Sequence, residues 1–367
     1  MRSYASFQSG TGLIDTTQFR EIILGQRRDG RARLWRALFR LASIPYGWGV
    51  AYRNWRFNSG RTPIEKVPAL VISVGNLTVG GTGKTPFVEW LARWFRQYED
   101  RVVIISRGYG AEAGQRNDEA LELEQKLPDV PHLQNPDRVH AARTAIEEFE
   151  SQVIILDDAF QHRRLNRDLD IVLLDALDPF GQGRLLPAGL LREPLRGLRR
   201  AQVVVLTRAD AVAATVREAI REQARRWAPE AIWVEVAHQP IALRASDGME
   251  QPLDALHGVP LAAFSGIGNP AGFRHSLTSC GYTLVGWREF PDHHAFTRDD
   301  IHDLERWAAS LSAQALICTH KDLVKIGLLR LGRIPLWALR IGMQPQAGSE
   351  MLLEQLTRLR DQHVVTE

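Results

Sequence analysis

Cysteine is nearly absent from this sequence. The 367 residues include only Cys280 and Cys318, and neither has the spacing of a metal ligand. This scarcity excludes a disulfide scaffold and a cysteine-based zinc site. We expect two reduced thiols in a cytosolic protein, both buried as small apolar side chains.

Long apolar runs are also missing. No stretch reaches the roughly 18–20 apolar residues that a membrane-spanning helix requires. Residues Met1–Arg20 lack the apolar core and the small-residue cleavage site of a signal peptide, so we expect the body of the protein to stay in the cytoplasm. The hydrophobic fraction of 44% and the charged fraction of 24% indicate a soluble globular protein, and the length predicts about two domains.

Charge is unevenly distributed between the N-terminus and the rest of the chain. Residues 1–66 carry 12 Lys and Arg against 4 Asp and Glu, a net charge of +8, whereas the whole chain carries +3. The remainder therefore has a net charge of −5 by subtraction. A basic arm on a mildly acidic body predicts an anionic surface as the partner of the arm alone.

The segment Arg31–Phe57 combines an amphipathic helical pattern with an aromatic stretch. Leucines and arginines fall on opposite helix faces: Leu34, Leu38 and Leu41 against Arg33, Arg36 and Arg40. We expect Pro45, Gly47 and Gly49 to end this helix. Aromatic residues interleaved with arginines follow: Trp48, Tyr52, Trp55 and Phe57. The pattern favours docking on a membrane surface. The alternatives are a helix packed on the protein's own body and, less favoured, a nucleic-acid contact.

From residue 67 onward, apolar runs alternate with helical patterns. The runs suit buried parallel strands at Ala69–Val74, Val102–Ser106, Val153–Leu156, Ile171–Leu174 and Val203–Leu206. Helical periodicity lies between several of them, as at Pro86–Tyr98 and Pro136–Phe149. This alternation predicts an α/β fold with a doubly wound parallel sheet.

The C-terminal third of the chain continues the same alternation. Further strand candidates are Ile232–Val236, Leu261–Phe264, Thr283–Trp287 and Ala315–Cys318. The polar, turn-rich segment Ala245–Pro260 predicts a boundary before a second, smaller α/β domain. The expected parts are an N-terminal helical arm (1–60), a main domain (61–250) and a C-terminal domain (251–367).

A glycine-rich segment between a strand and a helix has the pattern of a P-loop. Its members are Thr78, Val79, Gly80, Gly81, Thr82, Gly83, Lys84 and Thr85. The glycines let backbone N–H groups curl around phosphate oxygens, and the helix N-terminus adds its positive dipole end. Lys84 is expected to reach the β- and γ-phosphates of ATP, and Thr85 to hold Mg²⁺. Thr78 departs from the pattern, which has glycine there. The alternative is a glycine-rich turn with Lys84 solvated.

A second motif, an apolar strand that ends in two acids, supports a nucleotide-binding interpretation. The strand Val153–Leu156 ends in Asp157 and Asp158, the Walker B arrangement, whose carboxylates lie near Mg²⁺. Gln161 and His162 follow at once, in the loop where active-site residues of such sheets collect. A P-loop NTPase-like sheet is therefore the predicted fold.

Candidate groups for the acceptor side of a phosphoryl transfer are spread over several other segments of the chain. They are Arg107, Asp118, Glu119, Arg138, Arg192, Glu193 and His293. Arginines near a transferred phosphoryl group stabilise its oxygens, and a histidine near a carboxylate can act as or assist a general base at pH 7. Thr207–Asp210 and Thr319–Asp322 also end strands, and they are only weakly similar to the guanine-reading signature of GTPases.

Taken together, these motifs resemble the tetraacyldisaccharide 4′-kinase (lipid A 4′-kinase) family of Gram-negative bacteria. The residues that carry the resemblance lie in order along the chain: Gly75–Pro86, Ser106–Gly110, Asp157–His162, Arg167–Ile171, Leu186–Pro194, Phe264–Pro270 and Phe290–His293. Threonine at position 78 is itself usual for this family. The resemblance implies transfer of a phosphoryl group from ATP to the 4′-hydroxyl of a lipid disaccharide 1-phosphate, with Mg²⁺, at the inner membrane.

The resemblance also implies roles for individual residues. Asp118 and His293 match the family's catalytic dyad, with Asp118 taking the proton of the sugar hydroxyl. Lys84, Mg²⁺ and Arg192 are expected to balance charge on the γ-phosphoryl group. The remaining positions are expected to face the substrate: Arg107, Glu119, Arg138, Gln161, His162 and Glu193. This chain departs from the family at Asn117, Ala120 and Ala159, the last of which replaces a glycine.

Two other functions are compatible with the P-loop alone. A kinase for a soluble sugar or nucleotide would leave the basic aromatic arm unexplained. A membrane-associated nucleotide switch or partner-binding ATPase needs no acceptor base, so Asp118 and His293 would be dispensable in it.

Overall fold

A mostly parallel sheet runs through the protein in the computed structural model, which describes residues 16–108, 118–292 and 294–364. The strands are β1 (Leu70–Asn76), β2 (Val102–Ser106), β3 (His132–Gln134), β4 (Val153–Asp157), β5 (Leu169–Asp175), β6 (Val203–Thr207), β7 (Ile232–Arg244), β8 (Glu250–Gln251), β9 (Pro260–Ser265), β10 (Thr283–Glu289), β11 (Ala315–Thr319), β12 (Arg330–Leu331) and β13 (Ile334–Ala347). These 13 described strands have the order β10-β9-β11-β13-β7-β6-β5-β1-β4-β2-β3, with β12 paired to β13 and β8 to β7.

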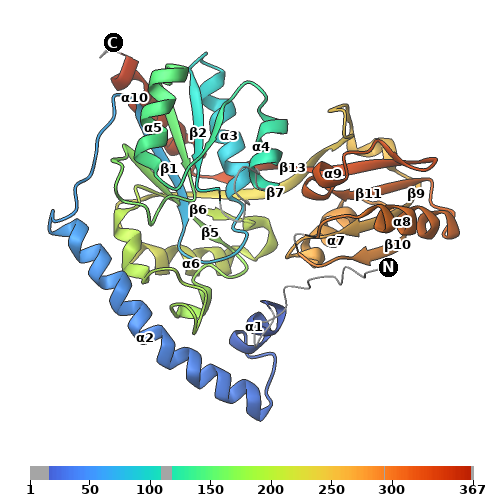
Figure 1. The fold of residues 1–367 in the computed structure, drawn as a ribbon, viewed down its shortest axis with the longest axis horizontal. Helices are drawn as coiled ribbons and strands as arrows, with labels where there is room; N and C mark the ends of the chain where they lie inside the picture. Colours follow the sequence, from blue (N-terminus) through green and yellow to red (C-terminus); the bar gives the residue numbers. More distant parts are fainter. Residues whose placement is uncertain (1–15, 109–117, 293, 365–367) are drawn as a thin grey trace, which may run out of the picture.

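Helices flank this sheet, as expected of an α/β fold. They are α1 (Thr16–Ile23), α2 (Gly30–Asn58), α3 (Lys84–Arg96), α4 (Asp118–Lys126), α5 (Arg138–Phe149), α6 (Ala214–Arg225), α7 (Pro270–Ser279), α8 (Arg298–Ser310), α9 (His320–Ile326) and α10 (Ser349–Val364). The long strands β7 and β13 pair antiparallel and run between the group around β1–β6 and the group around β9–β11 (Figure 1). The predicted α/β class is therefore confirmed.

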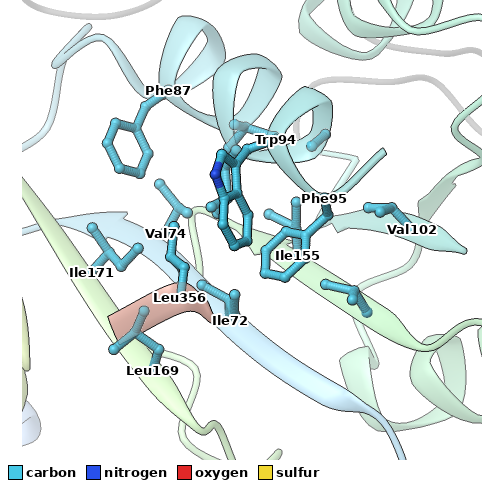
Figure 2. Close-up of a cluster of buried hydrophobic side chains, with 14 of the residues drawn as sticks. Ile72, Val74, Phe87, Trp94, Phe95, Val102, Ile155, Leu169, Ile171 and Leu356 are labelled. Atoms are coloured by element: carbon cyan, nitrogen blue, oxygen red, sulfur yellow. The ribbon is translucent and has the colours of Figure 1, made fainter. Parts of the chain in front are cut away.

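Strand β1, which leads into the glycine-rich loop, lies between β5 and β4, and both of its faces are covered by apolar side chains. On one face, Phe87, Trp94 and Phe95 of α3 pack against a buried cluster that includes Ile72 and Val74 (Figure 2). Leu352 and Leu356 of α10 join the same cluster. The opposite face is covered by small and branched side chains from α5 and its neighbours. A loop that starts from such a strand has a rigid base.

The nine predicted strands all occur, and most boundaries agree within two residues. Strand β7 continues well beyond the predicted Ile232–Val236, because its second half pairs with β13. Strand β13 has no counterpart among the predicted strands. Its sequence contains Pro335, Gly342 and Pro345, which weaken the pattern of a strand, and only the pairing with β7 and β11 reveals it.

The helix break that we expected at Pro45 does not occur in α2. The helix runs through this proline as one element of 29 residues from Gly30 to Asn58 (Figure 1). A proline costs a helix one hydrogen bond and adds a steric clash, and contacts made by later residues of α2 with the main part of the protein outweigh this cost. Within the described ranges, no helix has both the length and the apolar character needed to cross a membrane.

Candidate active site

The P-loop lies between the carboxyl end of β1 and the N-terminus of α3. Gly80 has a φ of 122° and Gly83 has a φ of 80°, conformations that side-chain-bearing residues rarely adopt. A Cβ placed on Gly80 or Gly81 would meet none of the described atoms within 4 Å. Backbone conformation thus favours glycine at positions 80 and 83, and the loop presents an open surface at Gly80 and Gly81. This is the geometry that backbone N–H groups need to approach phosphate oxygens.

Thr78, the residue that departs from the general pattern, is buried beneath a neighbouring segment. A Cβ on Gly181 would lie 2.9 Å from the Thr78 methyl group, so the threonine fills the space below that glycine. The backbone N–H of Val79 donates to the carbonyl of Leu190 at 2.8 Å. Asn76 Nδ2 donates to the Thr78 carbonyl at 2.7 Å. The start of the loop is therefore packed against residues 181–191.

The other end of the loop is braced from strand β6, which the sequence patterns did not indicate. Thr207 Oγ1 donates to the carbonyl of Thr82 at 2.9 Å. Arg208 donates from one nitrogen to the carbonyl of Gly81 at 2.7 Å and from Nε to Asp175 at 2.8 Å. The weak similarity of Thr207–Asp210 to a guanine-reading motif thus marks a segment that holds the P-loop. The signal in the sequence was only its position at the end of a strand.

Asp158 lies at the centre of a cluster of charges at the mouth of the P-loop. Strand β4 pairs with β1 so that Asp157 lies beside Val74, which brings both acids next to the loop. Lys84 Nζ lies 3.5 Å from Asp158 Oδ1, and Arg192 Nη1 lies 2.8 Å from both carboxylate oxygens. Burial opposes ionisation, but Lys84 and Arg192 together hold the pKa of Asp158 below its usual value. The side chains of Lys84, Asp158 and Arg192 are thus brought together.

The change from glycine to alanine at position 159 is compatible with the fold. The positive φ in this loop belongs to Asp158, at 51°, and not to Ala159. Ala159 is fully buried. Its methyl group therefore adds to the core without backbone strain.

Glu193 and Gln161 form a buried polar network behind Arg192. Glu193 is fully buried, and its carboxylate accepts hydrogen bonds from Arg200 at 2.8 and 3.0 Å and from Gln161 Nε2 at 3.1 Å. Gln161 Nε2 also donates to the carbonyl of Asn76, at the end of β1, at 2.9 Å. These contacts tie the segment that carries Arg192 to the base of the P-loop.

Arg138 lies close to both acids, and His162 lies close to Arg138. Burial, followed by the charges of Arg138, Arg167 and Arg164, lowers the pKa of His162 to about 4. The imidazole is therefore neutral at pH 7, and its buried Nδ1 has no hydrogen-bond partner among the described residues. Arg138 is buried, and its contacts with the carbonyls of Asn135 and Asp157 are long, at 3.4 and 3.5 Å. Both groups are poised for further hydrogen bonds.

The expected acceptor base cannot be placed in this site. Asp118 is the first residue of α4, but its side chain and that of Glu119 lie outside the described residues, as does His293. Arg107 is exposed at the carboxyl end of β2, the edge on which the P-loop also lies. The described residues thus build the donor side of the predicted site and leave its acceptor side as a prediction.

The described residues around the P-loop suit Mg²⁺ that is bound together with a nucleotide, and they do not form a site for a metal ion held by the protein alone. Among the described residues, no group of three or more His, Cys, Asp or Glu side chains could hold a metal ion. Mg²⁺ is usually held by one or two carboxylates together with substrate phosphates. The buried Asp157, the partly exposed Asp158 and the buried Thr85 at the first turn of α3 supply oxygen atoms of that kind.

Comparisons with known proteins connect this geometry to one family. The family "Tetraacyldisaccharide-1-P 4'-kinase" (LpxK) matches residues 35–358 of the chain. A tetraacyldisaccharide 4′-kinase of Anaeromyxobacter dehalogenans (strain 2CP-C) is 41% identical over 303 residues, which cover 78% of this chain and 80% of the relative. Another, of Syntrophus aciditrophicus (strain SB), is 36% identical over 348 residues, with coverages of 88% and 93%. A crystal structure of LpxK from Aquifex aeolicus in complex with ATP is similar with a TM-score of 0.71 and 31% identity, and the match covers 89% of this chain and 99% of that one.

Proposed function

Because the chain belongs to the tetraacyldisaccharide-1-P 4′-kinase family, we propose that it transfers the γ-phosphoryl group of ATP to the 4′-hydroxyl of a tetraacyldisaccharide 1-phosphate, a step of lipid A biosynthesis. The observation that carries this proposal is the convergence of Lys84 and Arg192 on Asp158 at the mouth of the P-loop. Two cations beside a phosphate-binding loop suit an enzyme that stabilises charge on a transferred phosphoryl group.

The residues of the P-loop would hold the donor. Backbone N–H groups from Thr78 to Thr85 would bind phosphate oxygens, and Lys84 would contact the β- and γ-phosphates. Thr85 with Asp157 or Asp158 would hold Mg²⁺, which supplies charge neutralisation between the β- and γ-phosphates. The open backbone at Gly80 and Gly81 supports this assignment.

Arg192 would act on the transferred group itself. Its guanidinium presents several N–H donors and is always charged, so it can contact equatorial phosphoryl oxygens. The ion pair with Asp158 would hold the guanidinium in the orientation that these contacts require. During transfer, the bond from the γ-phosphorus to the β–γ bridging oxygen breaks and a bond to the sugar oxygen forms. The proton of that hydroxyl would pass to Asp118, assisted by His293, as the family resemblance implies.

The acceptor would lie on the side of the site that polar side chains line at the carboxyl ends of β4 and β2. Arg138, His162 and Gln161 surround the carboxyl end of β4, and Arg107 projects from the end of β2. We assign these residues, with Glu119 and Glu193, to the binding of the sugar and its phosphate. Glu193 would act from within the protein, because its carboxylate is fully buried and already accepts three hydrogen bonds from Gln161 and Arg200.

Helix α2 would bring the enzyme to a substrate that stays in the bilayer. Large apolar side chains form an exposed stripe along it: Leu34, Leu38, Leu41, Ile44, Trp48, Tyr52 and Trp55. Their spacing of three or four residues puts them on one face of the helix. Arginines and tryptophans beside such a stripe suit the boundary between headgroups and acyl chains. We therefore place the enzyme at the cytoplasmic face of the inner membrane.

The test incubates the protein with γ-labelled ATP and Mg²⁺ under three conditions: with a tetraacyldisaccharide 1-phosphate in detergent micelles, with a soluble disaccharide phosphate, and with micelles that contain no acceptor. Label in the lipid supports the proposal. Label in the soluble sugar at an equal rate would favour a soluble-sugar kinase, and release of free phosphate alone would favour a nucleotide switch.

A further inference from the structure

Helix α2 has a second face, opposite the exposed apolar stripe, that contacts the site directly. Tyr46 and Asn54 lie eight residues apart, about two helical turns, and therefore on one face of α2. Gly47 lies close to the segment before Arg192, since a Cβ there would be 3.2 Å from Leu185 Cδ1. The helix is thus seated on the loop that carries Arg192.

Tyr46 makes the shortest of these contacts. Its hydroxyl group donates a hydrogen bond to the backbone carbonyl of Arg192 at 2.8 Å. On the other side of the same residue, the Arg192 backbone N–H donates to the carbonyl of Leu77 at 2.7 Å. The Arg192 backbone is therefore fixed from two directions, by the segment that leads into the P-loop and by α2.

Asn54 extends this contact to the neighbouring residue. Its Nδ2 lies 3.4 Å from Glu193 Oε2, and its backbone carbonyl accepts from Arg163 at 3.4 Å. The Arg163 guanidinium in turn lies over the ring of Phe57, 5.1 Å from its centroid. Three residues of α2, at positions 46, 54 and 57, thus lie against the buried network behind the site.

We propose that Tyr46 is a positioning residue for phosphoryl transfer, and that α2 fixes the orientation of Arg192 through it. This proposal rests on the proposed kinase function, in which Arg192 contacts the transferred group. A guanidinium that must meet phosphoryl oxygens in one geometry is sensitive to small displacements of its backbone. Burial, the largest influence, raises the pKa of Tyr46, so the phenol remains a donor over the working pH range.

The chain offers a matched control for this contact. Tyr282 also donates to a backbone carbonyl at 2.8 Å, that of Leu253, and it lies in the group around β9 and β10, away from Arg192. The substitutions Tyr46→Phe and Tyr282→Phe therefore remove the same hydroxyl and the same kind of hydrogen bond. Only the first removes a contact with Arg192.

The experiment measures kcat, the KM values for both substrates, and thermal unfolding for wild type, Tyr46→Phe, Tyr282→Phe, Arg192→Lys and the double variant Tyr46→Phe with Arg192→Lys. Loss of one hydrogen bond predicts a kcat about fivefold lower for Tyr46→Phe, with both KM values unchanged. Tyr282→Phe should keep the wild-type kcat. In the Arg192→Lys background, Tyr46→Phe should lower kcat by less than twofold, because the two residues act as a unit.

Two results would overturn the proposal: a wild-type kcat for Tyr46→Phe, or an undiminished loss in the Arg192→Lys background. An equal loss of kcat for Tyr46→Phe and Tyr282→Phe would also overturn it, because the effect would then reflect general stability. Failure of the wild-type protein to phosphorylate the lipid would instead reject the proposed function.

Discussion

One guanidinium nitrogen of Arg192, Nη1, lies 2.8 Å from each of the two carboxylate oxygens of Asp158. The pair links two loops that are 34 residues apart in the sequence and joins the acidic end of β4 to the segment before β6. Lys84 approaches the same carboxylate from the P-loop. Lys84 and Arg192 thus meet at one carboxylate beside the P-loop, and in the proposed function these two cations stabilise charge on the transferred phosphoryl group.

Removal of the Arg192 side chain should affect turnover far more than binding. We expect Arg192→Ala to lower kcat about 100-fold, because the guanidinium would act on charge that develops in the transition state. The KM for ATP should change much less. Steady-state kinetics with the lipid acceptor measure both quantities, and the exposed Arg196→Ala is the control. A kcat for Arg192→Ala within twofold of wild type would contradict the assigned role.

Arg208 should influence nucleotide binding although it was not expected to contribute to the site. Its hydrogen bond to the Gly81 carbonyl holds the P-loop. Arg208→Ala is expected to weaken ATP binding about fivefold, the equivalent of about 1 kcal/mol for the loss of one typical hydrogen bond. Calorimetric titration with a non-hydrolysable ATP analogue measures the change. The exposed Arg226→Ala should bind as wild type does, and equal affinities for all three proteins would refute the bracing role.

A buried ion cluster joins α4, the helix that begins at Asp118, to the rest of the protein. Substitutions in this cluster should lower the stability of the fold. Lys126 Nζ lies 2.8 Å from Glu122 and 3.3 Å from Glu89 of α3, and Arg340 of β13 also reaches Glu89, at 3.2 Å. Lys126→Met removes the cation that the buried Glu122 and Glu89 share and should cost about 3–5 kcal/mol of unfolding free energy. Urea unfolding checks this value. Exposed Lys66→Met should cost almost nothing, and an equally small cost at Lys126 would contradict the prediction.

Because of the same ion cluster, we expect the free energy of unfolding to fall in acid. Burial opposes the charge of Glu122, but Lys126, His320 and Lys321 hold its pKa well below the usual 4.5. Because the folded-state pKa is the lower one, the stabilisation is fully present above pH 4.5 and is lost progressively as the pH falls below it. Urea unfolding of wild type and of Glu122→Gln at a series of pH values should show a smaller acid-dependent loss in the variant. Parallel curves would show that Glu122 is not a source of this dependence.

His162 should remain neutral well below pH 6. Its pKa of about 4 results from burial and from three nearby arginines, Arg138 first among them. NMR titration of the imidazole should give an apparent pKa near 4 in the wild type. In Arg138→Met the pKa should rise, because a positive charge is removed. A wild-type value near 6.5 would show that the side chain is solvated, contrary to its position in the structure.

The donor side of the site was predictable because its signals are local. A run of glycines before Lys84 and an apolar strand ending in Asp157 each carry their chemistry within a few residues, and parallel pairing of β1 with β4 brings them together. For Arg192, the resemblance to a known family predicted a role at the phosphoryl group, and the structure shows its guanidinium at Asp158.

The residues that the sequence did not reveal act through long-range contacts. Arg208 meets Gly81 from a position 127 residues away, and Tyr46 meets Arg192 across 146 residues. No pattern in the neighbouring sequence indicates either contact. The expected break at Pro45 was wrong for the same reason: local propensity opposed the helix, whereas contacts of Tyr46 and Asn54 with the Arg192 loop support it. Strand β13 likewise depends on its partners and not on its proline-containing sequence.

The most direct test of the central claim is the position of the new phosphate in the product. The purified protein is incubated with ATP, Mg²⁺ and a tetraacyldisaccharide 1-phosphate in micelles, and the product is examined by two-dimensional ³¹P–¹H NMR. The account predicts a second phosphomonoester signal correlated with the proton at carbon 4′, and the same experiment with Lys84→Ala should give almost none. A new phosphate at any other carbon, or unchanged lipid beside consumed ATP, would contradict it.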